Sequence, residues 1–243
     1  QPEQSYSERQ IFEAATSRLA RELAAMEATD EVGGRAGSWS AGGFRFDTGP
    51  SWWLMPEVFD HFFEMLGTST AEQLDLVRLD PGYRVFFDDN GSDEKPIDVF
   101  GDQDRNRALF DEIEPGAGAA LDDYLRTGRQ AYDLAVERFL YTSFDSPRAF
   151  LGLPVLRHAK TLVTLLTTSL QSYIAARFTD RRLRQVLGYP AVFLGSSPER
   201  TPAMYHLMSW LDLADGVRYP NGGFTTLVDA LDRVARERGV RIS

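Results

Sequence analysis

The chain has 243 residues, of which 43% are hydrophobic and 26% are charged. This length allows one large domain or two small ones with a sizeable core. The formal net charge of −10 argues against nucleic acid as a partner, because a phosphate backbone requires a basic surface. The absence of cysteine excludes disulfides, thiolate metal sites and thiol catalysis. With neither a secretory signal nor a transmembrane stretch in the sequence, a cytoplasmic location is expected.

The N-terminal third is expected to begin with an amphipathic helix over residues 8–28, where apolar residues recur at steps of three and four. Residues 37–47 are rich in glycine and end in Phe-Arg-Phe-Asp, which predicts a short element of two or three strands. Pro56 is suited to the first turn of a helix, and Gly67 is suited to end it.

The rest of the chain is expected to be mainly helical after one hairpin that spans residues 83–100. A helical block covers residues 102–213, with an interruption at Pro115-Gly116 and its most apolar helix at 155–178. Further on, the pattern predicts a helix over residues 224–235 and the start of a strand at Gly239. The predicted fold class is therefore α/β in the broad sense, a mixed α+β arrangement.

A first candidate site combines Glu27 with the sequence Asp-Glu-Val-Gly-Gly-Arg-Ala-Gly-Ser that starts at Asp30. The pair Gly33-Gly34 lets a backbone approach a phosphate closely, and Arg35 offers a planar set of donors for it. Glu27 is placed to accept hydrogen bonds from ribose hydroxyls. Taken alone, these letters also fit a plain surface turn.

Two more glycine motifs follow later in the chain. Phe-Asp-Thr-Gly-Pro-Ser ends at Ser51, after Gly49 and Pro50. Tyr-Pro-Asn-Gly-Gly-Phe contains Gly222-Gly223 directly before a predicted helix, whose first N–H groups suit an anion or the edge of a flavin. Each of these motifs is also compatible with a structural turn.

Together, and in this order, the three motifs resemble those of the bacterial-type phytoene desaturases, within the amine-oxidase-like flavoproteins. The resemblance runs from about Glu27 to Ser243. It implies part of a two-domain FAD/NAD(P)-binding flavoprotein fold with a largely helical substrate region. It also implies an FAD-dependent oxidoreductase of carotenoid biosynthesis, in which flavin takes a hydride from phytoene or a similar long polyene.

The resemblance assigns roles to the glycine motifs. Glu27 would hold the adenosine ribose, and Gly33, Gly34 and Arg35 would meet the pyrophosphate. The flavin would lie near Gly49, Pro50 and Ser51. The flavin or the substrate would lie near the pair Gly222 and Gly223.

The sequence departs from the family at both ends. The family opens with a strand and Gly-x-Gly-x-x-Gly, which is absent before Glu27, and its later flavin-binding segment is absent too. The expectation is therefore a fragment that holds FAD weakly on its own. The expected divisions are an atypical helix (1–28), a partial FAD-binding region (29–82), a substrate region (83–218) and a return to the FAD-binding region (219–243).

Catalytic residues are not evident from the pattern. Asp145 and Arg148 are weak candidates for moving a proton, although a salt bridge in a loop explains the same pair. The histidines His61, His158 and His206 show no metal-ligand spacing and are expected on the surface or in the core.

Charge points to a membrane contact over residues 150–184. Between Ser146 and Pro198 the chain has one acid, Asp180, and seven basic residues, a local charge of +6, around the most apolar predicted helix. This pattern suits peripheral binding to anionic lipid, and it also suits a core helix with solvated ends. No oligomeric state follows from the sequence.

Other functions remain open at this stage. A related carotenoid or retinoid flavoprotein, such as a carotene oxidase or isomerase, would share the same motifs. A cofactor-free module that binds carotenoid or membrane and an inactive truncated product are the remaining alternatives.

Overall fold

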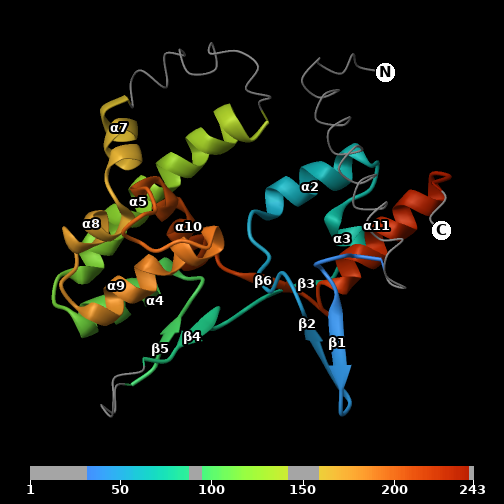
Figure 1. Ribbon diagram of the computed structural model, residues 1–243, viewed down its shortest axis with the longest axis horizontal. Coiled ribbons are helices and arrows are strands. Elements are labelled where there is room, and N and C mark those ends of the chain that lie inside the picture. Colours follow the sequence, from blue (N-terminus) through green and yellow to red (C-terminus); the bar gives the residue numbers. More distant parts are fainter. Residues whose placement is uncertain (1–31, 88–94, 142–158, 241–243) are drawn as a thin grey trace. The chain divides into compact units, whose positions relative to one another are not determined.

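The computed structural model describes residues 32–87, 95–141 and 159–240, which form two compact units (Figure 1). Unit 1 combines Gln1–Leu79 with Val217–Ser243, and unit 2 is Asp80–Gly216. The sheets among the described residues are all two-stranded and antiparallel. Helices dominate the remainder, as expected for a mixed α+β arrangement.

Unit 1 contains the predicted strand pair within residues 37–47. Strand β1 (Ser38–Ala41) pairs with β2 (Phe44–Asp47), so that Ser38 lies opposite Asp47. The connecting pair Gly42-Gly43 has φ angles of 59° and 84°, which a two-residue hairpin turn requires. A second ladder joins β3 (Leu76–Arg78) to β6 (Arg218–Pro220), which closes the unit across its two chain segments.

Three helices complete the described part of unit 1: α2 (Pro56–Met65), α3 (Thr70–Gln73) and α11 (Thr225–Glu237). Helix α2 begins at the predicted proline and is followed by Gly67, whose φ is 69°. The unit's core is a buried cluster of apolar side chains, namely Trp53, Phe63, Leu74, Phe224 and Ala230. The ring centroids of Trp53 and Phe59 are 4.0 Å apart.

The expected strand at Gly239 does not form at its first two residues. Gly239 has a φ of 84°, and Val240 N–H donates to Ala235 O at 3.1 Å. This is the closing turn of α11, in which a left-handed glycine satisfies the last helical carbonyls. Residues 241–243 lie outside the described part of the chain.

Unit 2 opens with the predicted hairpin of β4 (Tyr83–Val85) and β5 (Ile97–Val99). Helices α4 (Gln103–Ile113) and α5 (Ala117–Ala135) follow and pack on each other, and η1 (Val136–Leu140) extends α5. The break between the two helices occurs at Gly116, with a φ of 89°, where the sequence predicts it.

Short helices complete unit 2, and their buried faces share one core with α4, α5 and the hairpin (Figure 1). Phe110, Tyr124 and Phe178 form edge-to-face ring contacts at the centre of this core. The short helices are α7 (Ala159–Thr167), α8 (Leu170–Ala175), α9 (Arg181–Gly188), η3 (Tyr189–Leu194), η4 (Ala203–His206), α10 (Leu207–Trp210) and η5 (Leu211–Asp215).

The prediction of one apolar helix over residues 155–178 is wrong. Residues 155–158 lie outside the described part, and the remainder is divided into α7 and α8. At the break, Ser169 Oγ accepts from Ser172 N, and the neighbouring backbone pairs with the segment 201–203 through Leu170 N to Thr201 O at 2.7 Å. The serine cap and these tertiary hydrogen bonds replace the helical ones, which periodicity alone does not reveal.

Candidate functional site

The first glycine motif forms an exposed turn in unit 1. Gly33 and Gly34 have φ angles of 120° and 53°, and Ala36 N–H donates to Gly33 O at 2.9 Å. The N–H groups of Gly34 and Arg35 and the Arg35 guanidinium make no hydrogen bond within the described residues. As far as the described part of the chain goes, two backbone donors and one cation on this turn are therefore available, a combination that can bind an anion.

The second motif packs directly on the first. A Cβ on Gly49 would lie 1.9 Å from Arg35 O, so only glycine fits there. On the other side of the contact, Thr48 N–H donates to Gly37 O at 3.0 Å. The two turns are thus fixed against each other at the open end of the β1–β2 hairpin. Pro50 and Ser51 continue from this contact and are exposed.

Asp47 connects the second motif to the third. Its Oδ1 accepts from Phe224 N–H at 3.1 Å, and its Oδ2 accepts from the Tyr219 hydroxyl. A Cβ on Gly223 would lie 3.0 Å from Asp47 Oδ1. Burial, the hydrogen bond and the charge of Asp47 together raise the pKa of Tyr219 to about 12. The Asp47 carboxylate therefore joins the second motif to the third, and Gly49 packs the second motif on the first.

The start of α11 differs from the expectation of free N–H groups. The Phe224 N–H is taken by Asp47, and Gly223 N–H donates to Pro220 O at 2.9 Å. Thr226 and Leu227 donate to Gly223 O and Phe224 O. Most donors at this helix start are therefore satisfied within the chain. Gly222 stays exposed with a φ of 93°, and its backbone is the accessible part of the turn.

Several predicted site residues are outside the reach of the structure. Glu27, Asp145 and Arg148 lie outside the described residues, so their roles stay predictions. Sequence reasoning missed Asp47 and Tyr219, although both stand inside the quoted motifs. The available signal was the acidic residue at the end of the predicted strand, directly before Thr48-Gly49.

Unit 2 contains buried polar groups of its own. Asp212 Oδ2 accepts from the Tyr83 hydroxyl at 2.9 Å, and burial raises the Asp212 pKa to about 7. His206 contacts Ala203 O through Nδ1 at 2.7 Å and Thr127 Oγ1 through Nε2 at 3.1 Å. Burial lowers the His206 pKa to about 4. This histidine is therefore a neutral core residue, one of the two locations expected for it.

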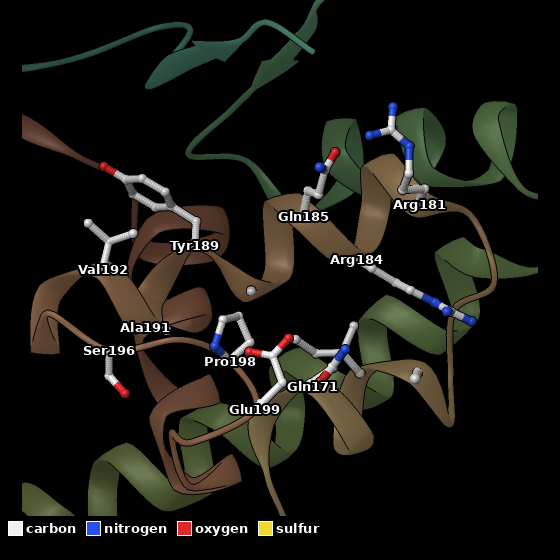
Figure 2. A pocket seen from close by; sticks show the side chains of 13 residues that line it. Gln171, Arg181, Arg184, Gln185, Tyr189, Ala191, Val192, Ser196, Pro198 and Glu199 are labelled. Atoms are coloured by element: carbon white, nitrogen blue, oxygen red, sulfur yellow. The ribbon is translucent and has the colours of Figure 1, made fainter. Parts of the chain in front are cut away.

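A pocket of about 520 Å³ lies in unit 2 between α8, α9, η3 and the segment 196–199. Figure 2 shows Tyr189 and Val192 at one end of this pocket and Arg181 and Arg184 at the other. Its lining thus has an apolar end and a cationic end, and it also includes the acidic Glu199.

Comparison with known proteins identifies the family. The family model described as flavin containing amine oxidoreductase matches residues 18–243. The chain belongs to this flavin-containing amine oxidoreductase family. Its similarity to carotenoid desaturases, expected from the glycine motifs, is confirmed by relatives with those names.

Three family members give the range of similarity. A carotenoid 3,4-desaturase of Haloarcula japonica is 42% identical over 90% of this chain and 43% of its own length. A zeta-carotene-forming phytoene desaturase of Myxococcus xanthus is 33% identical over 94% of this chain and 44% of its own length. A phytoene dehydrogenase of Streptomyces griseus is 33% identical over 90% of this chain and 42% of its own length. The chain thus spans less than half the length of these relatives.

Proposed function

We propose that this chain is part of an FAD-dependent oxidoreductase that desaturates a long polyene of the phytoene type. The observation that carries the proposal is the meeting of three glycine motifs around Asp47 and Gly49, beside donors on Gly34 and Arg35 that have no partner among the described residues. The names of the relatives favour desaturation over oxidation or isomerisation of the same class of substrate.

The donors on the first turn fit the most highly charged part of FAD. We assign the pyrophosphate to the N–H groups of Gly34 and Arg35 and to the Arg35 guanidinium, with Gly33 shaping the turn. FAD, when bound, accepts hydride from an allylic carbon of the substrate, a step that amino-acid side chains cannot supply. Glu27 at the ribose remains part of this proposal.

The other residues have positioning roles in the proposal. Gly49, Pro50 and Ser51 would border the flavin, and the exposed turn at Gly222-Gly223 would pass close to it or to the substrate. Asp47 holds these two segments together, so it is a positioning residue rather than a catalytic one. For proton handling we retain Asp145 and Arg148 as candidates.

Flavin binding tests the cofactor assignment. FAD titrated into the chain should change its fluorescence anisotropy on binding, and Arg35→Ala should weaken the affinity about tenfold or more, since a charge-assisted hydrogen bond contributes about 1.5–3 kcal/mol. Arg238→Ala is the matched control, because Arg238 is an exposed cation at the C-terminal end of α11. Equal affinities for the wild type and Arg35→Ala would contradict the pyrophosphate assignment.

Pigment formation tests the reaction. In a host that accumulates phytoene, the gene that carries this chain should yield products with longer conjugation, which absorb visible light. The same gene with Arg35→Ala should yield clearly less. A host whose carotenoids remain unchanged by the unaltered gene would contradict the proposed reaction.

A membrane contact through residues 150–184 completes the proposal, because a polyene substrate of this kind resides in lipid. Supporting it, Val163 and Leu166 on α7 each expose 59% of their surface, although they belong to the most apolar segment of the chain. No helix among the described residues has both the length and the apolar character needed to cross a bilayer. The proposed contact is therefore peripheral.

A further inference from the structure

The segment 181–200 of unit 2 is basic, in contrast to the chain as a whole. It contains four arginines and one acidic residue, Glu199, which gives +3 in a protein whose net charge is −10. Arg181 and Arg184 on α9 are both exposed. An exposed basic segment on an acidic protein is suited to an anionic partner.

Apolar side chains are exposed on η3, which directly follows α9 in the chain. The consecutive residues Val192, Phe193 and Leu194 of η3 expose 61%, 48% and 43% of their surface. Soluble surfaces tolerate single apolar side chains of this kind, but a run of three on one short helix marks an interaction surface. Gly195, with a φ of 59°, ends the helix immediately after them.

The pocket between α9 and η3 connects these two features. Tyr189 and Val192 line its apolar end, and Arg181 and Arg184 line its cationic end (Figure 2). Arg184 Nε donates to Phe178 O at 2.6 Å, which fixes its guanidinium at the outer edge of this cationic end while its side chain stays exposed. An amphiphile with an anionic head and an apolar tail matches these two ends, and Glu199 is the one acidic side chain in the lining.

We propose that α9 and η3 form the surface on which this protein contacts an anionic lipid bilayer. Val192, Phe193 and Leu194 enter the acyl boundary, and Arg181 and Arg184 bind lipid phosphates at the pocket. Apolar insertion beside basic residues is the usual composition of interfacial helices. The inference rests on the proposed membrane contact, and it places the inserting residues beyond the predicted range 150–184.

Flotation of the full chain with vesicles tests this surface. The wild type should bind vesicles of phosphatidylcholine with phosphatidylglycerol and bind pure phosphatidylcholine far less. Replacing Val192, Phe193 and Leu194 with serine should lower binding to the anionic vesicles about tenfold or more. The double variant Arg181→Gln with Arg184→Gln should lower it about fivefold for each lost charge near the surface.

A control on α7 separates this inference from the broader proposal. Val163→Ser with Leu166→Ser removes the exposed apolar pair that supports the broader membrane contact, and we expect it to lower the binding less than the η3 variant does. No vesicle binding by the wild type would contradict the membrane contact itself. Normal binding by the η3 variant, or loss only in the α7 variant, would overturn the η3 surface alone. The η3 surface would also be overturned if the η3 variant converted a dimer to a monomer without changing the binding to vesicles. Analytical ultracentrifugation without lipid would measure the oligomeric state.

Discussion

Two helices of this protein begin in different ways. In unit 2, α9 follows Asp180, whose carboxylate accepts from Arg182 N at 2.8 Å and Leu183 N at 3.4 Å. In unit 1, α11 has no side-chain cap from its own N-cap residue, and its Phe224 N–H donates to Asp47, 177 residues earlier. One helix start is thus specified by its neighbours, and the other depends on distant parts of the chain coming together.

The same contrast extends to the two units. The described part of unit 1 has its predicted site where three loops meet, and the backbone contact of Gly49 there leaves no room for a Cβ atom. Unit 2 is a helical core that surrounds buried titratable side chains. Changes at the glycine contact of unit 1 should therefore act through shape, whereas changes to the buried titratable groups of unit 2 should act through charge.

The largest effect is expected for Gly49→Ala. Its added Cβ would lie 1.9 Å from Arg35 O, so the backbone of one motif must move away from the other. Overpacking against a backbone atom that cannot yield should cost about 3–5 kcal/mol of unfolding free energy. Urea denaturation followed by tryptophan fluorescence would measure the loss.

Gly37→Ala is the control for this change, because its Cβ would meet Thr48 Oγ1 at 3.3 Å and a side-chain rotation can relieve the contact. Neither Gly37 nor Gly49 has a positive φ, so both changes act by steric contact alone. Equal stability of Gly49→Ala and the wild type would show that the two motifs are not packed as described.

The second effect concerns pH and unit 2. Asp212 has a folded pKa of about 7, raised by burial, so this group makes stability fall as pH rises from about 4 to 7. His206 has a folded pKa of about 4, lowered by burial, so it makes stability rise between about pH 4 and 6.5. Over the shared range the two contributions oppose each other, and each is on the order of 3 kcal/mol.

Single variants should separate the two contributions. Relative to the wild type, Asp212→Asn should gain stability as pH rises from 4 to 6.5, because only the histidine contribution remains. His206→Gln should lose stability over the same range, because only the aspartate contribution remains. Urea titrations at several pH values would measure how the unfolding free energy of each variant changes with pH. Parallel profiles for the two variants would contradict the opposite pKa shifts of these groups.

A smaller effect is expected where Asp47 joins the motifs. Asp47→Asn keeps the size of the side chain but replaces one charged acceptor that receives two hydrogen bonds. The loss should be about 2 kcal/mol, since hydrogen bonds to charged groups are stronger than neutral ones. Tyr219→Phe removes only one of the two and should cost about 1 kcal/mol. If the double variant loses the sum of both, the two residues do not act together.

The smallest effect is expected at the local cap of α9. Asp180→Ala should lower the unfolding free energy by about 1 kcal/mol, because it leaves the N–H groups of the first turn without their side-chain acceptor. Asp180→Asn should cost less, since asparagine caps equally well and only the ion pair with Arg182 at 3.0 Å is lost. Thermal denaturation of both variants would measure the difference. An equal loss of stability in both would show that Asp180 contributes through its charge rather than through capping.

These cases show what sequence reasoning can reach. The β1–β2 strand pair, α2, the β4–β5 hairpin and the break at Gly116 follow from periodicity, proline and glycine, and all were predicted. The division of the apolar segment at Ser169 was not, because it depends on hydrogen bonds to residues 201–203. The central position of Asp47 was also missed, since its partners are 172 and 177 residues away.

The contact between Gly49 and Arg35 has a consequence for the entropy of ligand binding. A loop held by backbone packing on a neighbouring turn has already lost much of its conformational freedom before any ligand arrives. Donors on such a loop are preorganised, so a bound phosphate does not have to supply the free energy that ordering would require. Short glycine turns, usually regarded as flexible, are in this arrangement the rigid part of the surface.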